Sequence, residues 1–387
     1  MAIDLQELSK KLKHLRKDVL KQELEDVASQ SGIHIEALRE MEQGRREPTG
    51  DQILILSDVY KQELAYFITG ERVDTFEKVN QLFRKFDKEL TPQDRMNIQE
   101  FLYLCRCEHD FETMMGGRPR IIHFDPNLRG TFFKGHGWEN AERLRKEFGF
   151  QDKPLVDVFG IARKLGYHIF RRKLGRSAIS GVFIRHREIG NCILVNYNED
   201  LYRQDFSALH ELAHAIFDKD YQVNLSLEDE QRGPEERREW RANAFAGRML
   251  IPRAKLERMD TSGDSELVAD EVKHLCREYR ANFDTGLYAM KDADRLTQDQ
   301  VDDLKGTRKI SQAEKDDAAL VGHAPKVKVR RLQLMKRGLS PEYVGVCFEA
   351  YHRGLISQGR LAEALLIQLD EMPEIAEMYG EPLEMKV

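Results

Sequence analysis

The residues with the clearest chemical potential are two histidines four positions apart, in the run His210-Glu211-Leu212-Ala213-His214. In an α-helix, residues four apart lie about 40° apart around the axis and one turn along it, so both imidazoles can reach one metal ion. Neutral imidazole nitrogens suit zinc. Glu211 lies about 100° further round from His210, where it can take a proton from a metal-bound water more easily than it can bind the ion.

A chance match is the alternative, because the chain holds twelve histidines and many glutamates. The flanking residues favour the metal interpretation. Leu209, Leu212, Ala213 and Ile216 would form one apolar stripe of a helix expected over residues 203–218. The two histidines would then project from the edge of a buried face into a cleft.

A catalytic zinc needs three protein ligands and one open position for water. The sequence predicts a further helix that ends near Leu250, and Glu239 and Asn243 lie beside its apolar face, four residues apart. We therefore predict Glu239 as the third ligand, with Asn243 steadying it or a neighbouring group. Glu235 and Glu236 are rival ligands, although acidic residues near a helix start also serve simply to stabilise the helix dipole.

The elements that would position these residues fall into four segments of a chain long enough for two or three domains. The segment that carries the histidines predicts a helix near 155–165 and three strands, at 167–171, 179–185 and 192–196. The strand edge of 179–185 or of 192–196 could hold an extended peptide. We predict an α+β fold with these parts: a helical N-terminal domain over 1–72, a helical linker over 73–136, a metal domain with a small sheet over 137–255, and a helical C-terminal region over 256–387.

The metal segment resembles the ImmA/IrrE metallopeptidases, which pair an HExxH motif with a downstream ExxANxFA helix. This chain has His210-Glu-Leu-Ala-His214 and Glu239-Trp-Arg-Ala-Asn243-Ala-Phe-Ala, preceded by Ile179-Ser-Gly-Val-Phe and Ile193-Leu-Val-Asn196. The likeness covers roughly residues 137–255. It implies a zincin-like (gluzincin) site and a zinc endopeptidase that cleaves a cognate transcriptional repressor in a bacterial or mobile-element stress or defence response.

The residue that would stabilise the oxyanion stays open in the sequence. Four side chains are candidates, namely Tyr197, Tyr202, His186 and Tyr221. A cysteine in the open coordination position would hold such an enzyme latent, with Cys192, Cys105 and Cys107 as candidates. The alternative for the cysteines, buried small side chains, is the more common situation.

Residues 12–70 resemble an Xre/Cro-type helix-turn-helix, with a turn at Gly32 and a third helix near 35–43. Its basic candidates for DNA or partner contact are Arg39, Arg45 and Arg46. Residues 1–72 hold eleven Lys and Arg against fourteen Asp and Glu, a poor balance for binding phosphates. The domain could therefore bind DNA or dock a protein, and a transcription regulator whose metal domain is structural or sensory is the rival function.

The overall composition indicates which partners and which cell compartment the protein can have. The net charge of −6 argues against a generally basic nucleic-acid coat, which leaves the basic run 326–337 as a local alternative for DNA contact. The five scattered cysteines form no disulfide framework, and no segment has the length and apolarity of a membrane span or a secretion signal. We expect a cytoplasmic protein without membrane contact, while its oligomeric state is left open.

Overall fold

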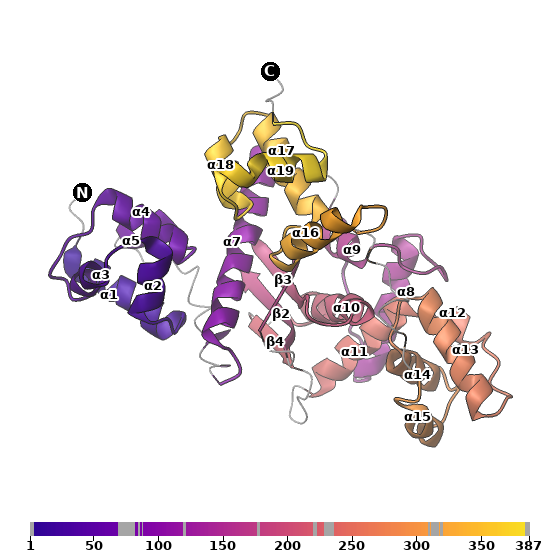
Figure 1. Ribbon diagram of the computed structural model, residues 1–387. Coiled ribbons are helices and arrows are strands. Elements are labelled where there is room, and N and C mark those ends of the chain that lie inside the picture. Colours follow the sequence, from indigo (N-terminus) through magenta and orange to yellow (C-terminus); the bar gives the residue numbers. More distant parts are fainter. Residues whose placement is uncertain are drawn as a thin grey trace.

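The N-terminal part of the computed structural model is a module of short helices (Figure 1). α2 ends at Gly32, whose φ of +68° lies in the left-handed region that favours glycine, so the expected turn is present. The module consists of α1 (Leu5–Lys13), a π-helical turn (His14–Val19), α2 (Leu24–Ser31), α3 (Ile35–Glu42), α4 (Gly50–Val59) and α5 (Leu64–Ile68). The structure describes residues 4–68, 82–83, 86, 88–118, 121–175, 179–219, 223–227 (backbone only), 236–308, 310, 317 and 320–383.

A four-stranded sheet in the order β1-β3-β2-β4 lies at the centre of the metal domain (Figure 1). β1 pairs with β3 in parallel, and the other two pairings are antiparallel. Among the described strands, β1 and β4 are therefore the edges of the sheet. The sequence suggested a free edge at 179–185 or 192–196, but these residues form β2 and β3, which are paired on both sides. The strands are β1 (His168–Arg172), β2 (Ile179–His186), β3 (Gly190–Asn196) and β4 (Val223–Leu227).

The predicted α+β class is confirmed, and the three expected strands coincide with β1, β2 and β3 to within two residues. The sequence missed β4. Along β3, Cys192 and Leu194 face one hydrophobic core, while Ile193 and Val195 face a second core on the other side of the sheet. The sheet thus separates two cores.

The face of the sheet that bears Ile193 and Val195 is covered by α10, which carries the histidine pair, and further helices extend this core away from the sheet. α8 and α11 approach closely because Gly137 has no side chain: a Cβ there would lie 2.5 Å from the Arg241 carbonyl oxygen and 2.8 Å from the Phe245 nitrogen. These helices are α8 (Phe133–Glu147), α9 (Val158–Lys164), α10 (Leu201–Phe217), α11 (Glu236–Leu250), α12 (Arg253–Leu256), α13 (Ser265–Glu278), α14 (Phe283–Asp292) and α15 (Gln298–Leu304).

The opposite face is covered by α7 (Pro92–Met114), a 23-residue helix from the segment expected to be a linker. Its charged residues are buried in specific contacts: Arg95 is 1% exposed and donates to the Val19 and Phe83 carbonyl oxygens at 3.0 and 3.1 Å. Charged residues in a helix usually indicate a surface exposed to solvent. The sequence therefore contains no sign that this helix is buried.

The C-terminal region contributes to both cores. Residues of α13–α15 belong to the core beneath α10, whereas the last helices pack with α7 on the other face. These last elements are α16 (Pro325–Lys336), α17 (Pro341–His352), α18 (Gln358–Ala364), a 3₁₀ turn (Leu369–Glu371) and α19 (Met372–Tyr379). No helix in the described part of the chain is both long and apolar enough to cross a membrane.

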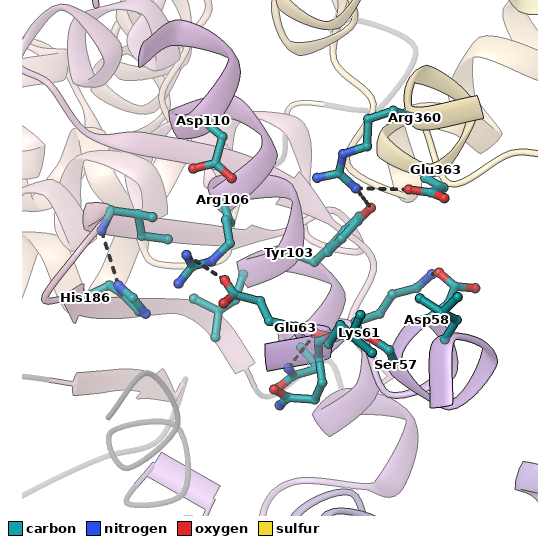
Figure 2. A pocket seen from close by; sticks show the side chains of 16 residues that line it. Ser57, Asp58, Lys61, Glu63, Tyr103, Arg106, Asp110, His186, Arg360 and Glu363 are labelled. Carbon is teal, nitrogen blue, oxygen red and sulfur yellow. Dashed lines mark hydrogen bonds and ion pairs between the residues drawn. The ribbon is translucent and has the colours of Figure 1, made fainter. Parts of the chain in front are cut away.

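A cavity of about 370 Å³ lies where the N-terminal module meets α7, the β2–β3 hairpin and α18 (Figure 2). Two arginines that line it reach polar groups of other elements, a glutamate and a tyrosine hydroxyl, and one of the two is also paired within its own helix. Arg106 contacts Glu63 at 2.7 Å, and Arg360 contacts Glu363 at 3.1 Å and the Tyr103 hydroxyl at 2.8 Å. This junction ties the N-terminal module to the rest of the chain.

Candidate metal centre

The helix that carries the histidine pair is fixed at its start and along one face. The Asp200 carboxylate accepts a hydrogen bond from the Tyr202 nitrogen at 3.0 Å and caps α10. The predicted apolar stripe, Leu209, Leu212, Ala213 and Ile216, is buried in the core beneath the sheet. The imidazoles therefore project from the edge of this face, toward α11.

Three ligand-type side chains converge between α10 and α11. Glu239 Oε2 lies 3.1 Å from His210 Nε2, and Glu239 Oε1 lies 3.1 Å from His214 Nε2. The two Nε2 atoms are also 3.1 Å apart. Ligands about 2.0–2.1 Å from one tetrahedral zinc ion are about 3.3 Å apart, so these side chains fit a zinc ion with little movement.

Among the described residues, this trio is the group of histidine, cysteine and acidic side chains whose ligand atoms converge, all within 4.8 Å of one another. Of the rival ligands, Glu236 is exposed at the start of α11, and Glu235 lies outside the described residues. Glu239 is the acid that the structure brings to the two histidines.

Each imidazole is held through its other ring nitrogen. His210 Nδ1 donates to Asn243 Oδ1 at 3.0 Å, and His214 Nδ1 donates to Asp218 Oδ2 at 2.7 Å. With Nδ1 as the donor, Nε2 keeps its lone pair for a metal. The sequence pointed to Asn243 but missed Asp218, although its position four residues after His214 was a usable signal.

Asp218 is itself positioned by α11, because Arg241 donates to Asp218 Oδ1. The Arg241 guanidinium lies over the Phe217 ring, 5.0 Å from its centroid, and is largely buried. α11 therefore supplies one ligand, Glu239, and also orients both histidines, directly through Asn243 and indirectly through Arg241.

The electrostatics of the site favour a cation beside the carboxylates. Burial alone would lower the pKa of His214, but hydrogen bonds with Asp218 and Glu239 and the charges of Glu239 and Glu211 raise it to about 10. Burial alone would raise the pKa of Glu239, yet its hydrogen bonds with both imidazoles hold it well below its usual range. Without a metal, a proton on His214 offsets the charge of the neighbouring carboxylates.

Glu211 is fully buried between α10 and β2. A Cβ at Gly181 of β2 would lie 2.7 Å from both Glu211 Cγ and Glu211 Oε1. The absence of a side chain at Gly181 therefore makes the space that the Glu211 carboxylate occupies. Its effect on the pKa of His214 shows that this carboxylate also acts electrostatically on the trio.

The oxyanion candidates are occupied elsewhere. The Tyr197 hydroxyl donates to Asp317 at 3.3 Å, and His186 lines the junction cavity, where its Nδ1 accepts from the Ile189 nitrogen at 3.3 Å. Tyr202 lies two turns before His210, about 12 Å along the helix. Tyr221 is outside the described residues.

The structure separates the cysteines from the metal trio. Cys192 faces the core on the α7 side of the sheet, together with Cys105 and Cys107. All three are buried there, and burial raises the pKa of the thiols of Cys105 and Cys107. They are core side chains, and the alternative of a cysteine in the open coordination position has no support.

The basic residues proposed for DNA contact are partly neutralised. Arg39 pairs with Glu36, and Arg46 lies 3.8 Å from Glu40, while Arg45 is exposed. In the run 326–337, Arg330 contacts Glu371 at 2.7 Å, whereas its lysines at 326 and 328 are exposed. Neither set forms a purely basic surface.

An α+β domain with a histidine–histidine–glutamate trio on two packed helices is typical of metal-dependent peptidases. Comparison with known families agrees: residues 162–284, from α9 into α14, match the model of the IrrE N-terminal-like domain, a peptidase family. This match supports an ImmA/IrrE-type domain over these residues. No curated protein matches the chain.

Proposed function

We propose that this chain is a zinc-dependent endopeptidase that cleaves a cognate transcriptional repressor in a bacterial or mobile-element stress or defence response. The observation that carries the proposal is the convergence of His210, His214 and Glu239 beside the buried carboxylate of Glu211. The match of residues 162–284 to a peptidase family supports it.

His210, His214 and Glu239 would hold a zinc ion, which would supply a Lewis acid for the scissile carbonyl and lower the pKa of a water to about 7. Glu211 accepts the proton of that water and later donates it to the leaving amine. Asn243 and Asp218 keep the imidazole Nε2 atoms directed at the ion. Gly181 keeps the Glu211 carboxylate in its place, because a side chain there would displace it.

The edge strand β4 is the natural binding place for an extended substrate. Among the described residues, β4 pairs only with β2, and β2 passes over Glu211 at Gly181. An added strand would bond to β4 through main-chain groups, which hold a peptide in register without reading its sequence. Side-chain selection then falls to pockets beside the metal.

The N-terminal module is, in this proposal, the part that captures the repressor. Ion pairs of Arg39 and Arg46 with neighbouring acids weaken the case for phosphate binding. The rival is a DNA-binding regulator with a structural or sensory metal site, which the arrangement of α2, Gly32 and α3 keeps open.

The test is co-expression with candidate repressors encoded beside the gene. Glu211→Gln keeps the shape of the side chain but removes the base, so we expect cleavage to fall about 10²–10⁴-fold. Metal analysis should still find about one zinc per chain in this variant, and far less in His210→Ala. Cleavage by the Gln variant at the wild-type rate would disprove the enzymatic role; full zinc content with no cleavage by any variant would favour the regulator.

A further inference from the structure

A groove of about 350 Å³ lies beside the metal trio and is bounded by four helices of the metal domain. It contains both tryptophans of the chain. Its walls come from α8 (Lys134, Trp138), α10 (Phe206), α11 (Trp240, Asn243, Ala244, Gly247, Arg248) and α14 (Asp284, Thr285, Tyr288, Ala289, Asp292).

Two residues connect the groove with the proposed reaction centre. Asn243 lines the groove, and its Oδ1 accepts the hydrogen bond from His210 Nδ1 at 3.0 Å. Phe206 forms another wall, and its ring lies 6.2 Å from the His210 ring, centroid to centroid. Both contacts place the groove directly beside His210, so a substrate that reaches the metal could extend one of its side chains into it.

The floor of the groove is made of small residues. On α11, Ala244 and Gly247 follow Trp240 at helical spacing and so share one face, next to the face that carries Glu239. A Cβ at Gly247 would meet nothing within 4 Å, which shows that the space above it is open. Small residues below and aromatic rings at the sides leave room for one large side chain.

The two basic side chains that line the groove are paired with acids. Lys134 contacts Asp292 at 3.4 Å, and Arg248 lies 3.6 Å from Glu142 with its guanidinium over the Trp138 ring. A charged occupant would have to displace these pairs, whereas an uncharged one would not. Trp240 and Tyr288, 44% and 40% exposed, offer apolar surface that such an occupant would cover.

We propose that this groove is the specificity pocket of the chain and receives a large uncharged side chain, aromatic or branched aliphatic, from a substrate residue that flanks the scissile bond. The proposal rests on the proposed peptidase function and names its substrate class. It adds a selection step that depends on α11 and α14, separate from the metal ligands and from the strand edge.

Gly247→Leu tests the pocket, because the new side chain would fill it without touching a metal ligand. Gly345→Leu is the matched control: Gly345 also lies within a helix, is equally half-buried and has nothing within 4 Å of its Cβ position. The zinc-loaded full-length proteins are given a mixed peptide library, and cleavage sites are read by mass spectrometry.

We expect the wild type and Gly345→Leu to cleave beside Phe, Trp, Leu and similar residues. Gly247→Leu should lose at least about 10-fold of this preference over Ala, since even one methylene is worth that much in an apolar pocket. Unchanged preference in Gly247→Leu, or a wild-type preference for charged or small residues, would overturn the proposal.

A binding measurement separates this proposal from the peptidase function. Both tryptophans lie in the groove, so tryptophan fluorescence of the zinc-loaded Glu211→Gln protein reports its occupancy. N-acetylphenylalaninamide and N-acetylleucinamide should give saturable changes that N-acetylalaninamide and N-acetyllysinamide do not give, and Gly247→Leu should abolish them. Binding without any peptide cleavage by the wild type would retain the pocket and reject the peptidase; cleavage with no fluorescence response would reject the pocket alone.

Discussion

Two buried clusters of histidine and glutamate lie on opposite faces of the sheet, and they differ in the source of the balancing positive charge. Beside α7, His168 Nδ1 lies 2.6 Å from Glu108 Oε2, and Arg118 lies 3.1 Å from the same carboxylate and also contacts Glu112. Beside α10, the Glu239 carboxylate lies between two imidazoles. The α7 cluster is balanced by a guanidinium of the chain itself.

An arginine behind the metal trio is used differently. Arg241 contacts Asp218 behind His214 and leaves the front of the trio to the three ligand atoms. The comparison teaches that residue type alone does not make a metal site. What matters is whether a protein cation already occupies the point at which the ligand atoms converge.

The largest effect is expected in the α7 cluster. Arg118→Met would leave the buried Glu108 and the partly buried Glu112 without their guanidinium partner, and removing one partner of a buried pair lowers stability by about 3–5 kcal/mol. Urea unfolding followed by circular dichroism measures this loss. A change under about 1 kcal/mol would contradict the view that Arg118 balances the cluster, and zinc binding should survive as the control.

Zinc should have the same balancing role at the metal trio beside α10 that Arg118 has beside α7. At free zinc 100 times the dissociation constant, we expect about 2.7 kcal/mol of added stability in the wild type, because the ion binds only the folded chain tightly. His214→Ala should show no such gain, whereas Arg118→Met should show all of it. Thermal unfolding with zinc and with a chelator gives the answer, and a gain that persists in His214→Ala would place the ion elsewhere.

A smaller effect is expected behind the ligands. Asp218→Asn keeps the size of the side chain but removes the charge that orients and polarises His214, and such changes weaken metal binding about 10–100-fold. Competition with a coloured zinc chelator measures the affinity. The carboxylate has no orienting role if the Asn variant binds zinc as tightly as the wild type.

The smallest effect is expected for Glu112→Gln. Burial and the charge of Glu108 raise the pKa of Glu112, so its ionised form is already disfavoured in the folded chain. A raised pKa of an acid in the folded state means that stability falls as pH rises through that pKa. Unfolding free energies at several pH values should therefore differ between wild type and variant by no more than about 1 kcal/mol, with the variant less sensitive to pH.

The sequence predicted the helix of the histidine pair well, because its apolar residues recur at helical spacing and are buried as expected. It also pointed to Glu239 and Asn243, which the structure brings to the histidines. It could not reveal the distribution of the C-terminal helices over two cores, because this depends on contacts between segments far apart in the chain. The polar residues of α7 concealed its burial, since their partners are remote in sequence.

The missing side chain at Gly181 links two positions that a sequence alone would treat as independent. A β-carbon there would lie 2.7 Å from Glu211 Oε1, so we expect the residues at these two positions to change together in related chains. A relative without the glutamate can carry a larger residue at the glycine position in the strand. A relative that keeps the glutamate should also keep the glycine. The pair at 181 and 211 therefore offers a simple marker for sorting related genes into those that still carry a base and those in which it has decayed.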